Sequence, residues 1–170
     1  MIEYKVEVYE DGDKQWYLNG KCHREDGPAI ERANGTKHWY LNGQLHREDG
    51  PAVEFASGHK EWFLNGERHR EDGPAVELAN GHKWWYLNGQ RHREDGPAIE
   101  YADGSKFWYL NDKHHREDGP AVEFANGDKE WHLNGKEISE QEFLSQTIKE
   151  MTLAEVVEKL GYDIKIVKES

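Results

Sequence analysis

The chain has 170 residues and a formal net charge of −12 at pH 7, from 22 Lys and Arg against 34 Asp and Glu. A hydrophobic content of 35% and a mean hydropathy of −1.07 argue against a thick globular core, and the acidic charge opposes direct contact with nucleic-acid phosphates or anionic lipid. Seven Trp, eight Tyr and five Phe are atypical of a disordered chain. We therefore expect a thin stack of elements with an aromatic core.

The first residues have no basic segment followed by an apolar one, and no run of about 18 apolar residues occurs anywhere. We therefore expect no signal peptide, no membrane span and a cytoplasmic location. Cys22 is the only cysteine, which excludes a disulfide framework and a Cys-based metal site. Residues 3 to 9 alternate charged and apolar side chains before Asp11-Gly12, so residues 1–13 are expected to form an N-terminal capping strand and its turn.

One motif then recurs along the chain. His-Arg-Glu-Asp-Gly-Pro-Ala begins at residues 23, 46, 69, 92 and 115, and each copy follows a Trp by seven positions, so the period is 23 residues (46 minus 23). A fixed period of this length is typical of repeat architectures, in which each unit buries its apolar face against its neighbours. Residues 14–137 are expected to form five to six hairpin repeats in an elongated, mainly β stack with a single twisted sheet.

Each repeat contains two turn signals. Asn65-Gly66 and Ser57-Gly58 stand for the two kinds, and we expect both to be two-residue type I′ loops. This fixes a register in which Glu54 faces Glu61 and Val53 faces Trp62. The equivalent pairs predict a hydrophobic ladder of Trp against Val or Ile on one face, with Tyr and Phe on the other face, open to solvent or to a partner.

The last repeat gives way to a different pattern. Ser139 to Glu142 has the sequence of a capping box, with Ile138 and Phe143 at the hydrophobic-staple positions, so we expect a helix that ends near Glu150. A second helix is expected from Thr152 and a strand after Gly161. Residues 138–170 are therefore predicted to form a helix-helix-strand cap.

The Trp-x-x-Asn-Gly hairpin, the following Gly-Pro-Ala-Val-Glu and the Ala102 to Ser105 turn resemble the MORN repeat and its variants over about residues 14 to 136. The insertion of Arg-Glu-Asp after each His departs from a typical MORN unit and lengthens the loop. This version is similar to repeat proteins of bacteriophages and large DNA viruses. The resemblance implies a binding or scaffolding module, and some MORN variants act as antitoxin components.

The His-Arg-Glu-Asp clusters could suggest metal binding or acid–base chemistry. Five near-identical copies instead favour a structural role, in which Arg47 pairs with a carboxylate of its own or the next loop, Asp49 binds turn amides and His46 packs at the loop base. We assign no catalytic residue, no metal site and no cofactor. The residues assigned to the structural ladder are Trp16, Trp39, Trp62, Trp85, Trp108, Trp131, Arg24, Arg47, Arg70, Arg93, Arg116, Asp26, Asp49, Asp72, Asp95 and Asp118.

Positions that differ between copies are better candidates for binding. These are the position before each Trp and the position before each His. If they align on neighbouring repeats they form an exposed aromatic patch, although the C-terminal tail or a second subunit could cover it. The turn Asn111-Asp112 in this region lacks the usual Gly, so it is expected to be less ideal and displaced. The candidate binding residues are Trp84, Tyr86, Phe107, Tyr109, Arg68 and Arg91.

We predict a non-enzymatic protein that binds another protein. With the resemblance, this becomes a phage-encoded inhibitor or adaptor that acts on a host defence protein in the host cytoplasm. One alternative is a protein that sequesters a nucleotide, with Arg68 or Arg91 on its phosphate. Another is an acidic nucleic-acid mimic or antitoxin-like binder of a basic surface. A homo-oligomer is also compatible with the sequence.

Overall fold

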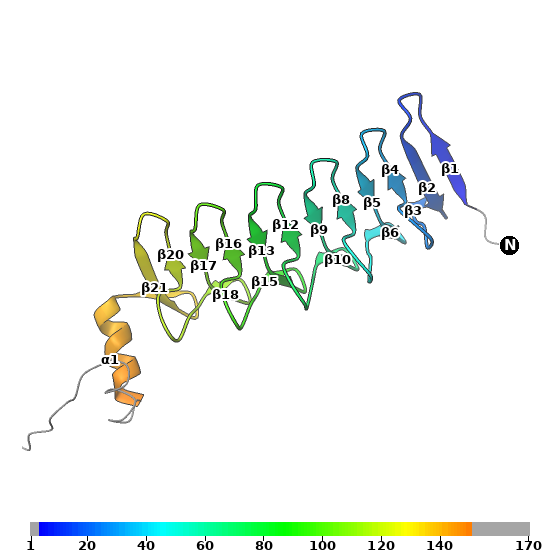
Figure 1. The fold of residues 1–170 in the computed structure, drawn as a ribbon. Coiled ribbons are helices and arrows are strands. Elements are labelled where there is room, and N and C mark those ends of the chain that lie inside the picture. The colour runs from blue at the N-terminus through cyan, green and yellow to red at the C-terminus, as the bar shows by residue number, and fades with distance from the viewer. Residues whose placement is uncertain (1–3, 151–170) are drawn as a thin grey trace, which may run out of the picture.

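The computed structural model describes residues 4–150, with side chains described up to residue 146. It is mainly β, an elongated antiparallel sheet that ends at one helix (Figure 1). Fourteen strands form the main sheet, and β3 (Lys21–Cys22) pairs with β2 off its path. In spatial order the others are β1 (Lys5–Val8), β2 (Lys14–Leu18), β4 (Ile30–Glu31), β5 (Lys37–His38), β8 (Val53–Glu54), β9 (Lys60–Glu61), β12 (Val76–Glu77), β13 (Lys83–Trp84), β16 (Ile99–Glu100), β17 (Lys106–Phe107), β20 (Val122–Glu123), β21 (Lys129–Leu133) and β22 (Lys136–Ile138).

Shorter hairpins form a second tier beside this sheet. They are β6 (Tyr40–Leu41) with β7 (Gln44–Leu45), β10 (Phe63–Leu64) with β11 (Glu67–Arg68), β14 (Tyr86–Leu87) with β15 (Gln90–Arg91), and β18 (Tyr109–Leu110) with β19 (Lys113–His114). Within a repeat, Trp62 joins the end of β9 to the start of β10. Neighbouring repeats are also hydrogen-bonded in this tier, because the N–H of Gly66 donates to Leu45 O at 2.8 Å and the N–H of Arg47 donates to Phe63 O at 3.1 Å.

The short hairpins confirm the predicted Asn-Gly turns. Asn65 and Gly66 have φ values of 51° and 86°, and Leu64 pairs with Glu67 across them. Two consecutive residues with positive φ are the requirement of a type I′ turn, which Asn and Gly meet at low steric cost. Successive repeats show the same φ pattern at this turn.

The hairpins of the main sheet have a different turn, and the predicted register is wrong by one residue. Phe55 donates its N–H to His59 O at 2.9 Å, and Gly58 donates to Phe55 O at 2.9 Å. Only Gly58 has a positive φ, of 89°, so the loop contains three residues and ends in a left-handed Gly. As a result Val53 pairs with Glu61, and Glu54 pairs with Lys60.

Electrostatics gives a physical reason for the observed register. The predicted register places Glu54 opposite Glu61, and like charges directly opposite one another destabilise a sheet. In the structure Glu54 lies between Lys37 and Lys60 instead. The same alternation of Lys and Glu continues across the main sheet from Lys14 on β2 to Lys129 on β21.

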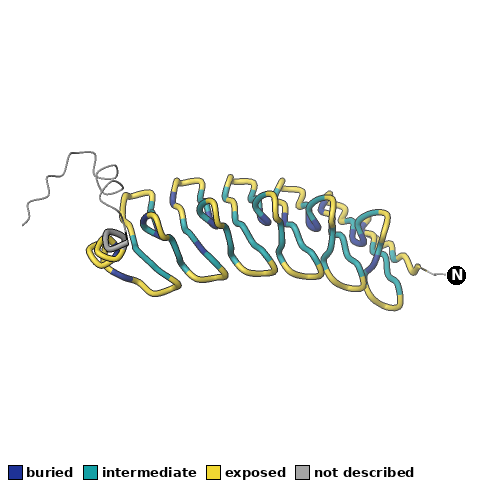
Figure 2. Tube along the Cα trace, turned by 90° about the horizontal axis from the view of Figure 1, so that it is seen from below, coloured by how far each residue is buried: buried dark blue, intermediate teal, exposed yellow. Residues whose placement is uncertain are grey.

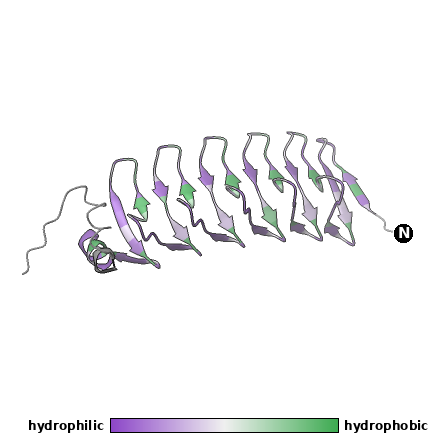
Figure 3. Ribbon diagram, turned by 60° about the horizontal axis from the view of Figure 1, so that its bottom comes forward, coloured by the Kyte–Doolittle hydropathy of each residue, from purple (hydrophilic) through white to green (hydrophobic). Residues whose placement is uncertain are grey.

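The shift of one residue exchanges the two faces of each strand. Val53 therefore lies on the opposite face from Trp62, and the predicted ladder of Trp against Val or Ile does not form. The buried centre is thin and rests on small residues that recur once per repeat (Figure 2). Hydrophobic segments likewise recur once per main-sheet hairpin (Figure 3). The alanines with no exposed surface are Ala29, Ala52, Ala75, Ala98 and Ala121.

The C-terminal end carries helix α1 (Glu140–Glu150), as predicted. Ser139 Oγ accepts a hydrogen bond from the N–H of Glu142 at 3.1 Å, which caps the helix, and the staple residues Ile138 and Phe143 are both buried. The predicted second helix and final strand lie outside the described residues. No helix within residues 4–150 is long and apolar enough to cross a membrane.

Candidate interaction face

The sheet register sorts the repeat residues onto two faces. On the strand that runs from β9 to β10, Glu61 and Phe63 lie on one face, and Lys60, Trp62 and Leu64 lie on the other. We call the first the variable face and the second the loop face. The variable face collects both series of positions that differ between copies, represented in the central repeats by Glu61, Trp84, Phe107, Arg68, Arg91 and His114, together with Phe63, Tyr86 and Tyr109.

Arg68 connects the two tiers of the variable face. Its Nη2 lies 2.9 Å from Glu61 Oε2, and its Nε donates to the same oxygen at 3.0 Å. The guanidinium carbon is 5.5 Å from the centroid of Phe63 and 5.7 Å from that of Tyr86, so it contacts aromatic rings of two successive repeats. Glu61 is only 9% exposed, whereas the Arg68 side chain is 39% exposed, so a buried carboxylate holds an arginine that stays accessible.

Arg91 makes a comparable arrangement one repeat later. Its guanidinium carbon lies 4.1 Å from the centroid of Tyr109, and its Nε donates to Asp112 Oδ1 at 2.6 Å. Burial by itself opposes ionisation of Asp112, but the hydrogen bonds from Arg91 outweigh it and lower the pKa of this carboxyl. The prediction of a displaced Asn111-Asp112 turn is wrong, because Tyr109 still pairs with His114 and the backbone of both turn residues keeps a positive φ.

Trp84 and Phe107 flank Ile99, which is opposite both of them on the sheet. Both aromatic side chains are half-buried and pack against the buried cluster formed by Ala98, Ile99 and Tyr109. Tyr109 is only 7% exposed, so it supports the face from beneath and is not part of an exposed patch. Of the six predicted binding residues, five are therefore partly accessible on the same face.

A histidine pair that the sequence reasoning missed extends this face toward the C-terminus. His114 Nε2 lies 2.8 Å from the hydroxyl of Tyr109, and the ring centroids of His114 and His132 are 5.0 Å apart. His132 Nε2 is 3.1 Å from Glu130 Oε2. Burial, followed by the nearby His132 and Arg91, lowers the pKa of His114. The available signal was that His132 replaces the Tyr or Phe found after the other tryptophans of the 23-residue series.

The loop face contains the residues that recur in every repeat, and its arginines have the predicted structural role. Arg70 lies over the indole of Trp62, with its guanidinium carbon 4.1 Å from the ring centroid. It donates to Asp72 at 2.9 Å, to Pro74 O at 3.3 Å and to Glu77 at 3.0 Å. The hydrogen bond from Arg70 lowers the pKa of Asp72. The same set of contacts recurs at Arg24, Arg47, Arg93 and Arg116.

The expected ion pair of Arg47 is confirmed, since it binds Asp49 at 2.8 Å and Glu54 at 3.0 Å. The main contact of Asp49 is this ion pair, and a weaker hydrogen bond from its own backbone N–H is the one contact found to a turn amide. His46 also links two repeats, because its Nδ1 accepts the N–H of Asn65 at 3.2 Å.

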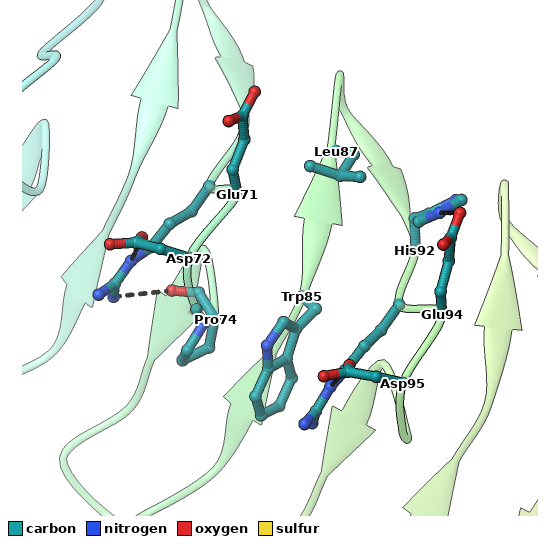
Figure 4. A pocket seen from close by; sticks show the side chains of 11 residues that line it. Glu71, Asp72, Pro74, Trp85, Leu87, His92, Glu94 and Asp95 are labelled. Atoms are coloured by element: carbon teal, nitrogen blue, oxygen red, sulfur yellow. Dashed lines mark hydrogen bonds and ion pairs between the residues drawn. The ribbon is translucent and has the colours of Figure 1, made fainter.

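Open grooves lie between successive loops on the loop face. In one of them Trp85 and Leu87 lie between Glu71, Asp72 and Pro74 of the preceding loop and Glu94 of their own loop (Figure 4). Its volume is about 760 Å³, and equivalent grooves of about 680 and 790 Å³ lie one repeat to either side. Within residues 4–146, no group of three or more His, Cys, Asp or Glu side chains is placed to hold a metal ion.

Neither the known protein-family models nor the curated protein sequences match this chain.

Proposed function

We propose that this protein is a non-enzymatic repeat protein that binds another protein on its variable face. The observation that carries this proposal is that the two faces contain different kinds of residues. The recurring Trp, Arg and Asp residues contact one another on the loop face. Two series that differ from copy to copy, the position before each Trp and the position before each His, lie together on the opposite face. A frame with recurring loops on one side and these two variable series side by side on the other suits recognition of one particular surface.

The composition of the variable face supports a protein partner. Trp, Tyr and Arg are the residue types that most often dominate binding energy at protein interfaces. Arg68 and Arg91 are already oriented by Glu61 and Asp112, so little side-chain freedom is lost when a partner binds. A guanidinium has five N–H donors, which leaves donors for a carboxylate or carbonyl of the partner.

The same contacts argue against the nucleotide alternative. That alternative assigns Arg68 or Arg91 to a phosphate, but each of these side chains is paired with a carboxylate of this chain. A phosphate would lie close to Glu61 or Asp112 and would be repelled by it. The resemblance to MORN variants of phages and large DNA viruses extends the proposal to an inhibitor or adaptor that acts on a host protein.

Affinity capture from lysate of a bacterial host tests the proposal. Arg91→Ala should lower the affinity for the captured partner about tenfold or more, because it removes a central, pre-oriented arginine. The matched control is Glu94→Ala, whose side chain is 86% exposed on the loop face and should leave binding unchanged. The proposal fails if no specific partner is retained, or if both variants retain it as well as the parent chain does.

A further inference from the structure

The first strand is the least covered part of the sheet. Large hydrophobic side chains that remain exposed within the described residues concentrate there, with Tyr4 at 37%, Val6 at 47%, Val8 at 67% and Tyr9 at 43%. The other end of the sheet is followed by α1, where the staple residues are buried. An edge strand with exposed apolar side chains is a template for pairing with another strand.

The backbone of β1 is oriented for such pairing. Trp16, opposite Val6, donates its N–H to Ala29 O and accepts the N–H of His23, so both of its backbone groups point away from β1. Directly opposite residues of an antiparallel pair either exchange both hydrogen bonds or exchange neither. The N–H and C=O of Val6 therefore point to the free side of β1. By the alternation along a strand, those of Tyr4 and Val8 point there as well.

The sequence around Val6 is complementary to itself. In an antiparallel pair of two β1 strands with a two-fold axis at Val6, the two Val6 residues face each other. Lys5 then faces Glu7 of the second copy, and Tyr4 faces Val8 of the second copy. Opposite charges and aromatic–β-branched pairs are the favourable cross-strand combinations. An axis at Val6 also places the outward-pointing N–H and C=O of the two Val6 residues opposite each other, so that they form a hydrogen-bonded pair.

We propose that two copies of this chain associate through β1, so that their sheets join into one continuous sheet across a two-fold axis. The contact is isologous, because each copy uses the same strand, and it therefore closes at the dimer. The interface is small and largely backbone-mediated, which places it in the class of weak, reversible contacts.

Sedimentation equilibrium from roughly 5 to 500 µM brackets the affinity expected for an interface of this size. The parent chain should pass from monomer to dimer and stop there. Lys5→Glu and Glu7→Lys should each raise the dissociation constant at least about tenfold, because each places like charges opposite one another at two symmetry-related positions. Lys113→Glu makes the same charge change on an exposed strand residue far along the chain and should have no effect.

Charge exchange then identifies the register. An equimolar mixture of the Lys5→Glu and Glu7→Lys chains should form a heterodimer, and the double variant Lys5→Glu/Glu7→Lys should dimerise like the parent chain. The weakening caused by each single variant should shrink in about 1 M salt, where charges are screened within roughly 3 Å.

Val6→Pro provides a test that is independent of charge. It removes an N–H that β2 does not use, so circular dichroism and thermal unfolding should match those of the parent chain while the dimer is lost. The proposal is overturned by a chain that stays monomeric over the whole range, by a dimer that persists in Val6→Pro or in both single charge variants, or by a species that grows beyond two copies.

Discussion

The loop arginine is the residue on which each repeat depends most. Arg70 stacks on an indole and donates to two carboxylates and one carbonyl, although its side chain is only 23% exposed. This combination requires a planar guanidinium, because a lysine ammonium offers neither a stacking plane nor a fork of fixed donors. The contacts of Arg70 join the loop to Trp62 before it and to Glu77 on the strand that follows.

Replacing this arginine should therefore destabilise the protein. We expect Arg70→Ala to lower the free energy of unfolding by about 1–3 kcal/mol, and Arg70→Lys to recover only part of that loss. Urea denaturation followed by tryptophan fluorescence measures both. Glu71→Ala, at a neighbouring side chain that is 87% exposed, is the matched control and should change stability by less than about 0.5 kcal/mol. Equal urea midpoints for Arg70→Ala and the control would contradict the assigned role.

Asp112 shows how one residue can depart from the repeat pattern without changing the turn. Its φ of 62° is a left-handed conformation that Gly adopts more easily, yet Asp tolerates it better than most residues. The side chain gains a hydrogen bond to the Nε of Arg91 at 2.6 Å and one to its backbone N–H at 3.1 Å. These contacts offset the conformational cost and fix Arg91 on the variable face.

At the scale of single elements, the two hairpin turns of a repeat obey different rules. The Asn65-Gly66 turn needs a positive φ at both residues, whereas the turn at Ser57-Gly58 needs it only at Gly58. A Cβ added at Gly58 would meet no other atom within 4 Å, so substitution there tests backbone conformation alone.

Gly58→Ala should cost about 1 kcal/mol of stability, since Ala must adopt a left-handed conformation. Ser57→Ala should change the free energy of unfolding by less than about 0.5 kcal/mol, because Ser57 is not left-handed. Chemical denaturation of the two variants side by side gives both values. A third variant, Ser57→Gly, gives the contrary test. If it were stabilising, Ser57 as well as Gly58 would have to be left-handed, as the predicted two-residue loop requires.

These two kinds of turn explain which parts of the structure could be predicted from the sequence. Periodicity, the Asn-Gly hairpins and the start of α1 could be predicted, because each depends on local chemistry at fixed spacing. The main-sheet register could not, since Ser57-Gly58 resembles a type I′ pair and a slip of one residue exchanges the faces. The overlooked signal is that the predicted register places Glu54 opposite Glu61, which is unfavourable. A shift of one residue removes this contact and makes Lys and Glu alternate across the sheet.

The same error limited what could be predicted of the candidate site. The positions that vary between copies were identified correctly, but the wrong register placed Trp62 with Val53. The face opposite Trp62 was thus predicted to be open to solvent or a partner, but the ion pair between Arg68 and Glu61 on that face was not predicted. His114 and His132 are distant in sequence, and only the stacking of neighbouring repeats brings their rings together.

At the scale of the whole molecule, repetition multiplies small electrostatic effects. A hydrogen bond from the loop arginine lowers the pKa of Asp26, Asp49, Asp72 and Asp95 in turn. A carboxyl whose pKa is lower in the folded than in the unfolded chain stabilises the fold above the unfolded pKa of about 3.9, and this stabilisation is lost as the pH falls below it.

Acid should therefore destabilise the protein in two windows. Burial lowers the pKa of His38 and of His114, so the stability that depends on their neutral forms is lost as the pH falls below about 6.5. Protonation of the four loop aspartates causes the second loss of stability, below about pH 4. Urea midpoints measured between pH 7 and pH 2.5 should show both losses. Combining Asp→Asn changes at the four positions should flatten only the lower window, and an unchanged profile in that variant would refute the contribution of these ion pairs.

The separation of a uniform loop face from an individual variable face also has a genetic consequence. Unequal recombination between two near-identical coding copies adds or removes 69 bases, which is three for each of the 23 residues of the period (46 minus 23), and the reading frame is kept. The resulting chain finds every indole, guanidinium and carboxylate of the frame in its usual place, while the order of side chains offered to a partner is new. If the variable face binds a partner as proposed, gain, loss or exchange of whole repeats would change the specificity without compensating changes in the scaffold.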